Sequence, residues 1–289
     1  MRHFTLLFAI FAVACGVQAQ EHQPETEKTP WPIEPKSERV EYMLYLDNMN
    51  YELMGEPNEV DPAFAEIYSE IANESQDKIV NGILEVNAEA IEAWHKFVWL
   101  CNEGREKEAM EFYYEEHIVI DMALRHSLVR YSLHNDVIGY MAYEHLDPIK
   151  ADELMMDVLG FDFAIVCLTY TMGADEYYLE VIDAICDILF TMYRDNERWD
   201  DMLNLYDMWL ETTGYGEVYK DILAAVNFSR ANIHFHLKND TETALKYLYE
   251  AKVNAEEYFN DGGKDKEMKV LLKSVKKMIK EVEKQCQDL

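Results

Sequence analysis

The stretch LCNEGREKEAMEFY, residues 100–113, joins two helix-like segments through a short polar turn. Its marker positions follow one another at offsets of four, five and four residues: Leu100, Gly104, Ala109 and Tyr113. The same offsets recur twice, at Tyr193, Glu197, Met202 and Tyr206, and at Phe235, Asn239, Ala244 and Leu248. The pattern predicts three pairs of helices, each pair joined by a tight turn.

This spacing resembles the tetratricopeptide repeat (TPR), in which antiparallel helix pairs stack on one another. The resemblance implies an all-α fold of TPR-like pairs stacked in a right-handed superhelix, which presents a surface to protein segments. It covers about a third of the chain, and the repeats start about 93 and 42 residues apart rather than at the usual period of about 34. Bulky or polar residues also replace the usual small ones, at Phe97, Phe190, Asn232, Trp209 and Glu116.

Residues 40–289 have a helical composition, because only three prolines occur there and glycine is sparse. We therefore predict a single α-helical repeat domain over 40–289. The first helix is expected at Glu41–Met54, and a second from Pro62 toward Val86. Asn87 is expected to cap a third helix. Later boundaries are expected at Asp147-Pro148, at Gly214-Tyr215-Gly216 and at Asn239-Asp240-Thr241.

The N-terminal segment has the pattern of an export signal. A basic start is followed by an apolar run and small residues, which predicts a signal peptide over 1–19. Residues 12–16 also resemble a bacterial lipobox, which would lipidate Cys15. Residues 20–39 contain four prolines among charges and predict a disordered tether. The expected location is outside the cytoplasm, in the periplasm or associated with the outer membrane.

The charge is strongly negative, at −30. A field of this sign repels phosphate backbones and excludes nucleic acid as a partner. Residues 264–289 differ, with eight Lys against five acidic residues and a narrow apolar stripe at Leu271, Val275, Met278 and Val282. This helix is expected to cap the domain. The alternative is an amphipathic helix on an anionic membrane.

The five cysteines form no C-x-x-C pair, so neither a zinc site nor a thioredoxin-type motif is indicated. Cys101, Cys167 and Cys186 lie in apolar helical stretches, where a thiol behaves as a small hydrophobe. Cys167 and Cys186 flank an expected turn at 173–175, so a disulfide between them is an open alternative in an exported protein. The axes of packed helices usually lie too far apart for a disulfide to form easily between them.

Candidate catalytic and metal-binding residues are few. Glu92 and His95 share a helix face, as in di-iron bundles, but no second Glu-x-x-His is present. His117 and Asp121 are four residues apart and would have to complete such a site. His234 and His236 point in opposite directions on a helix and are assigned no role. No nucleophile elbow or phosphate-binding loop occurs, so we expect neither catalysis nor a cofactor or metal.

Aromatic residues are the remaining indication of function. The TPR resemblance implies that Tyr113, Tyr193, Tyr206 and Phe235 line a binding groove, although aromatic residues that pack helices give the same pattern. Few bases are available to hold a peptide carboxylate, apart from Lys96 and Arg230. The sequence predicts a non-catalytic exported scaffold or adaptor with a protein or peptide partner, and with membrane contact only through a lipid anchor. The alternatives are a surface-associated glycan- or ligand-binding lipoprotein and a helical-bundle metalloprotein.

Overall fold

A computed structural model describes residues 29–55, 65–66, 69, 72–73 and 75–287, with side chains as far as residue 285. The described residues are all-α, with helices joined by short turns and no strand among them. The predicted signal peptide, Cys15, the start of the tether and the helix start at Pro62 lie outside this set. The chain divides into two compact units, residues 1–162 and 163–289. The sequence analysis predicted a single repeat domain over 40–289.

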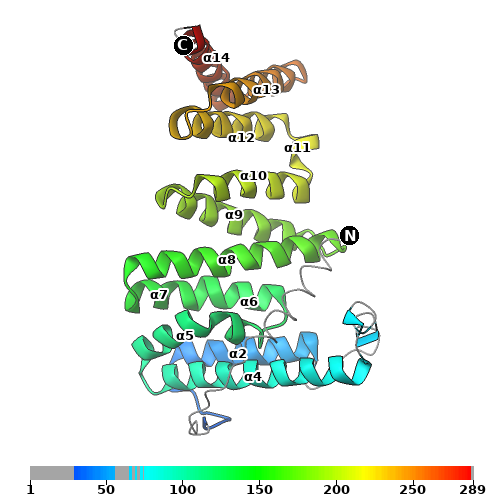
Figure 1. Cartoon of the computed structure of the whole chain (residues 1–289), viewed down its shortest axis with the longest axis vertical. Coiled ribbons are helices and arrows are strands. Elements are labelled where there is room, and N and C mark those ends of the chain that lie inside the picture. Colours follow the sequence, from blue (N-terminus) through cyan, green and yellow to red (C-terminus); the bar gives the residue numbers. More distant parts are fainter. Residues whose placement is uncertain (1–28, 56–64, 67–68, 70–71, 74, 288–289) are drawn as a thin grey trace. The chain divides into compact units, whose positions relative to one another are not determined.

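The first unit is built on a pair of long helices, α4 and α5 (Figure 1). α2 packs on α4 and α6, and α5 packs on α7. Its elements are α2 (Glu38–Met54), α4 (Gln76–Asn102), α5 (Glu106–Asp121), α6 (Ser127–Leu133), the π-helix η1 (His134–Ile138), α7 (Gly139–His145) and the first part of α8 (Pro148–Thr171). Trp94 and Phe97 of α4 and Tyr113 of α5 are fully buried, and the Phe97 and Tyr113 ring centroids lie 5.0 Å apart between the two helices.

The second unit contains the end of α8 followed by α9 (Tyr177–Asp195), α10 (Trp199–Thr213), α11 (Tyr215–Val218), α12 (Lys220–Asn232), the π-helix η2 (Ile233–Leu237), α13 (Thr241–Asn260) and α14 (Lys266–Gln287). α9 packs on α10, α12 on α13, and α13 on α14 (Figure 1). Its core includes a cluster of small and aliphatic residues from α12, α13 and α14, among them Ala231, Leu248 and Val275.

The three predicted helix-turn-helix stretches are confirmed as local structure. In each of them the second marker position has a left-handed backbone, with φ of +71° at Gly104, +55° at Glu197 and +54° at Asn239. A left-handed residue ends a helix because it redirects the chain while the last carbonyls still accept hydrogen bonds. The shared offset of four residues therefore marks the distance from the last helical turn to this reversal.

The hydrogen bonds at the first two turns are alike. The Arg105 N–H donates to the Leu100 carbonyl at 2.9 Å, and the Arg198 N–H donates to the Tyr193 carbonyl at 2.8 Å. At the third turn the Asp240 N–H donates to the carbonyl of His234, one residue further back. The cause is η2, since a π-helix inserts one extra residue into the turn.

Several helix boundaries differ from the prediction. Asn87 does not begin a helix, because α4 runs without interruption from Gln76, where Ser75 accepts a hydrogen bond from the Lys78 N–H. α2 begins at Glu38, three residues before the predicted start, with Ser37 as its cap. The predicted start at Pro148, the turn at Gly214 and the Asp240 cap are confirmed.

The predicted tether is wrong for residues 29–39. Trp31 stacks on His95 of α4, with ring centroids 3.7 Å apart and planes 10° from parallel. The Lys36 N–H donates to Asn102 Oδ1 at 2.8 Å, and Asn102 Nδ2 donates to the Glu34 carbonyl at 3.1 Å. A buried asparagine side chain thus satisfies the backbone of a proline-rich segment, which composition alone does not reveal.

α8 is the one described helix that is long and apolar enough to cross a membrane by length and composition. Half of its most apolar window is buried inside the structure, and the helices of soluble cores pass the same test. α8 also carries Asp162, which is fully buried and accepts a hydrogen bond from Arg130 Nε at 2.8 Å. A paired charge of this kind fits a core helix.

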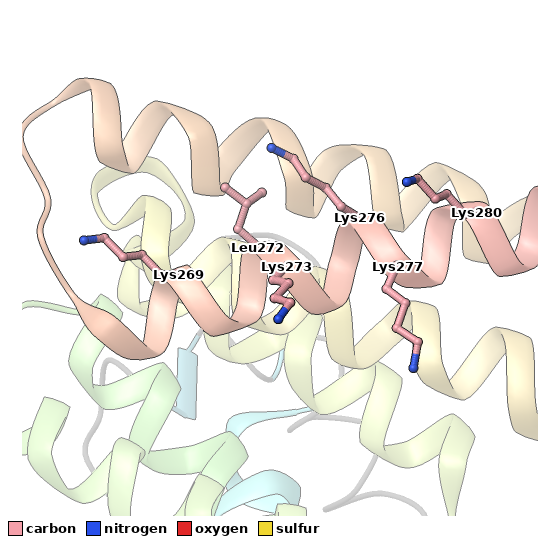
Figure 2. Close-up of a pocket in the computed structure, with 6 residues that line it drawn as sticks. All are labelled: Lys269, Leu272, Lys273, Lys276, Lys277 and Lys280. Atoms are coloured by element: carbon pink, nitrogen blue, oxygen red, sulfur yellow. The ribbon is translucent and has the colours of Figure 1, made fainter.

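The apolar stripe of α14 is buried against α12 and α13, as expected for a helix that caps the unit. Val275 and Val282 are fully buried, so the stripe is not free to lie on a membrane. Figure 2 shows lysines of α14 projecting on both sides of the helix. They line a shallow depression of about 460 Å³. One of them, Lys276, forms an ion pair with Glu256 of α13 at 2.8 Å.

Candidate functional site

A pocket of about 350 Å³ in the second unit combines aromatic rings with carboxylates. Four consecutive helices contribute to it, so residues from a continuous stretch of chain meet at one place. We call it the aromatic–acidic pocket, and it is lined by Asp183 and Asp187 of α9, Trp209 of α10, Tyr215 of α11, Tyr219 at the end of α11, and Ile222 of α12.

Local sequence explains how these side chains come together. Asp183 and Asp187 are four residues apart on α9, so both carboxylates lie on one face of that helix. Gly214 ends α10 with φ of +67°, a conformation that costs glycine little, and the chain then forms the single turn of α11. The Tyr219 N–H donates to the Tyr215 carbonyl at 2.8 Å, which places both tyrosines on the same side of that turn.

The three rings form two right-angled corners. The Trp209 and Tyr215 centroids are 5.5 Å apart with planes at 90°, and the Tyr215 and Tyr219 centroids are 5.4 Å apart with planes at 85°. Trp209 and Tyr215 are partly buried, whereas Tyr219 remains 48% exposed. The pocket therefore has two fixed walls and one wall open to solvent.

Asp183 holds the two inner rings in place. Trp209 Nε1 donates to Asp183 Oδ1 at 2.8 Å, and the Tyr215 hydroxyl donates to Asp183 Oδ2 at 2.9 Å. Burial and the hydrogen bond to Asp183 raise the pKa of Tyr215 to about 12, so the hydroxyl remains protonated and continues to donate. Both oxygens of Asp183 are thus engaged within the chain.

Asp187 is exposed, and within the described part of the chain it forms no ion pair or hydrogen bond. The pocket consequently presents one engaged and one unengaged carboxylate beside π-electron faces. Its lining consists of two carboxylates, three aromatic rings and one aliphatic side chain. This arrangement can hold a cationic or polarised group.

A second polar cluster lies fully inside the first unit. His134 Nδ1 is 2.5 Å from Asp162 Oδ2, and His134 Nε2 is 2.9 Å from the Tyr113 hydroxyl and 3.1 Å from Asp121 Oδ1. Tyr113 also donates to Asp121 at 2.5 Å, and Arg130 donates to Asp162. All five side chains are at most 7% exposed, so this network offers no access to a ligand.

The two carboxylates of the network keep His134 charged. Burial alone lowers the pKa of His134, but the charges of Asp162 and Asp121 outweigh it and raise that pKa to about 9. For Asp121, the cost of burial is outweighed by His134, so its pKa lies below the usual value. The network is a balanced set of buried charges that joins α5, α6, η1 and α8.

The structure corrects the predicted groove residues. Tyr113 is fully buried, and Tyr206 and Phe235 are each 8% exposed, so these three side chains belong to the core. Their marker positions face the partner helix of the same pair, which explains why the spacing selects large apolar residues there. Tyr193 is half-buried beneath the guanidinium of Arg198, at 5.4 Å from the ring centroid.

The disulfide between Cys167 and Cys186 is not formed, since both are free and buried. They lie on α8 and α9, and packed helix axes are usually about 8–10 Å apart, wider than a disulfide bridges with ease. Burial raises the pKa of the Cys167 thiol to about 12 and that of Cys186 further still. Neither thiol is set up as a nucleophile.

The predicted metal-ligand candidates have other partners. His95 stacks on Trp31, and burial lowers its pKa to about 4. His117 Nδ1 lies 3.2 Å from the Tyr114 carbonyl, and Asp121 belongs to the buried network rather than to a pair with His117.

Within the described residues, one other group gathers potential metal ligands, namely Glu106, Glu144 and His145, whose ligand atoms lie within 4.8 Å of one another. Arg39 forms ion pairs with both glutamates, at 2.9 and 3.2 Å. The chain therefore supplies its own cation to this cluster.

The two bases considered for holding a peptide carboxylate are also engaged. Lys96 lies over the Phe112 ring at 3.9 Å from its centroid, and Arg230 is buried and paired with Asp207. Comparison with protein-family models, curated proteins and solved structures finds no match to this chain. The structure thus describes an all-α protein that carries the aromatic–acidic pocket.

Proposed function

We propose that this protein is a non-catalytic, exported, TPR-like scaffold or adaptor that binds protein segments in the bacterial cell envelope. The observation that carries the proposal is the aromatic–acidic pocket. Its inner wall is rigid because Asp183 fixes Trp209 and Tyr215, while Tyr219 and Asp187 remain open to a partner. Aromatic anchors in partly enclosed pockets dominate the energy of many protein interfaces.

Two further features support the proposal. The left-handed residue recurs at the same marker position in three helix pairs, and a helix–turn–helix pair is the repeating unit of a TPR-like array. Export is supported by the basic start and apolar run of residues 1–13 and the small residues that follow. Export also places the protein where an acidic surface meets envelope proteins rather than nucleic acid.

The proposal is tested by cross-linking the protein in its native envelope, purifying it and identifying bound proteins by mass spectrometry. The test compares the wild type with Tyr219→Ala, which opens the pocket, and with Tyr249→Ala, which removes a tyrosine of similar exposure from α13. We expect one partner in near-stoichiometric amount from the wild type and Tyr249→Ala, and much less from Tyr219→Ala. Recovery of the chain alone from all three would refute the scaffold function.

Glycan binding is the second candidate, because aromatic faces and carboxylates also bind sugars. The perpendicular arrangement of the three rings favours a compact group over a sugar ring that would stack along a single aromatic face. Glycan binding by the purified protein that is lost in Tyr219→Ala would support this candidate in place of the scaffold.

A further inference from the structure

We infer that the aromatic–acidic pocket holds the ammonium head of a lysine side chain carried by the bound segment. The inference rests on the proposed binding function and names the chemical group that the pocket selects. Three properties of the pocket carry it: an uncompensated negative charge, a corner of π-electron faces, and a single carboxylate left to accept hydrogen bonds.

The charge of the pocket has no counterpart within the described chain. Neither Asp183 nor Asp187 forms an ion pair with any described lysine or arginine. Lys220, which opens α12 beside the pocket, pairs with Glu257 at 3.6 Å instead. An entering cation therefore meets two carboxylates without displacing a basic residue of the protein, whereas an anion is repelled.

The rings add a preference for a compact cation. A positive group is attracted to the face of Trp or Tyr when it lies within about 6 Å of the ring centroid. Adjacent rings at 90° and 85° form corners, so a small cation in such a corner contacts two ring systems at once. Ile222 closes the lining with an apolar surface, which suits the methylene chain of a lysine.

Because Asp183 is already hydrogen-bonded, the pocket favours a lysine side chain over an arginine side chain. A guanidinium binds best when a carboxylate accepts two parallel hydrogen bonds from its planar fork. Both oxygens of Asp183 already accept bonds from Trp209 and Tyr215, so a guanidinium could form its two parallel bonds only to Asp187, whose carboxylate is exposed to water, where an ion pair contributes little. An ammonium is a compact charge with three N–H donors, so one carboxylate oxygen and ring faces satisfy it. A quaternary ammonium would leave Asp187 without a donor.

The test measures binding of short acetylated Gly/Ser peptides to the full chain by isothermal titration calorimetry. The probes carry a single lysine, a single arginine, or a single norleucine, which matches lysine in shape but has no charge. Free tetramethylammonium serves as a fourth probe. We expect the lysine peptide to bind, the arginine peptide to bind several-fold more weakly, and the norleucine peptide not to bind at millimolar concentration.

Two exposed positions allow the pocket to be altered without disturbing the core. Asp187→Asn removes the unengaged charge, and Tyr219→Ala removes the open wall. Each is expected to weaken binding of the lysine peptide about tenfold or more. The matched controls Asp261→Asn, at the end of α13, and Tyr249→Ala, also on α13, remove the same groups elsewhere and should leave binding unchanged.

Several results would overturn the inference. These are equal binding of the norleucine and lysine peptides, equal loss in Asp187→Asn and Asp261→Asn, or tighter binding of tetramethylammonium than of the lysine peptide. Failure of the inference is distinguishable from failure of the proposed function. A cross-linked protein partner whose capture is unaffected by both pocket variants would keep the scaffold function and refute the lysine pocket. Selective lysine binding without any envelope partner would support the lysine pocket and refute the scaffold function.

Discussion

The buried His134 network makes the stability of this protein depend on pH in a defined direction. The pKa of His134 is about 9 in the folded protein and about 6.5 in the unfolded chain. A base with a raised folded pKa stabilises the fold fully below its unfolded pKa, and that contribution disappears as the pH rises through the folded value. The difference of the two values corresponds to about 3 kcal/mol of unfolding free energy lost between pH 6.5 and about 9.

The assay is urea denaturation followed by circular dichroism at several pH values in this window. The unfolding free energy of the wild type should fall by about 3 kcal/mol between pH 6.5 and about 9. The unfolding free energy of His134→Gln should be lower than that of the wild type at pH 6.5 and should change little with pH. Asp121→Asn removes one of the two carboxylates and should shift the wild-type decline to lower pH. His236→Gln, an exposed histidine of η2, is the control and should follow the wild type. If the unfolding free energies of the wild type and of His134→Gln changed in parallel with pH, His134 would not be the source of the pH dependence.

Three further outcomes follow from single residues. Burial raises the pKa of Asp47 to about 6, because the charged form is penalised in the folded protein. Asp47→Asn should therefore increase the unfolding free energy at pH 7.5 by about 1–3 kcal/mol, as measured by denaturant titration. A lower unfolding free energy in this variant would contradict the prediction. Because Glu197 has φ of +55°, Glu197→Gly should raise the melting temperature, with a gain of about 1 kcal/mol, while Gly104→Ala should lower it by a similar energy. The buried thiols of Cys101, Cys167 and Cys186 should resist thiol labelling in the native protein and react in urea, as read by peptide mass mapping; rapid native labelling would show that these helices open.

The helix pairs could be predicted because their signals are local. A left-handed turn residue and the apolar positions around it lie within a few residues of one another, as at Gly104 and Asn239. Helix starts with a cap were also predictable, as at Asp240. The start at Asn87 was wrongly predicted because a capping residue is only a preference; Ser75 caps the helix instead, and α4 continues through Asn87.

The candidate site was not predictable by the same means. With 56 acidic residues in the chain, carboxylates four apart recur by chance, so Asp183 and Asp187 carry no signal until three rings are seen beside them. The tyrosines four apart at Tyr215 and Tyr219 were the available indication, but the sequence suggested only a turn there. Spacing also could not separate groove residues from core residues, and Tyr206 proved to be core.

The buried network joins residues whose partners are distant in sequence. His134 meets Asp162, 28 residues away, and Tyr113, 21 residues away. The i, i+4 relation of His117 and Asp121 suggested a pair, but Asp121 instead pairs with the fully buried His134, whose charge it neutralises, and the half-buried His117 lies beside the Tyr114 carbonyl. Which histidine pairs with Asp121 depends on the burial of each side chain, and the sequence pattern does not reveal that burial.

Site-specific photo-cross-linking tests whether the aromatic–acidic pocket contacts a partner protein through a lysine. A photoreactive amino acid is placed at Val218, which is 68% exposed and adjoins Tyr219 at the pocket, and separately at Val270 of α14, which is 65% exposed. Cross-linking is then performed in the native envelope, and the attachment point on the partner is mapped by tandem mass spectrometry. We expect attachment from Val218 to a lysine-containing segment of one protein, a strong reduction of that attachment in Asp187→Asn, and no attachment to this segment from Val270. The same products from both positions, or none from Val218, would contradict this expectation.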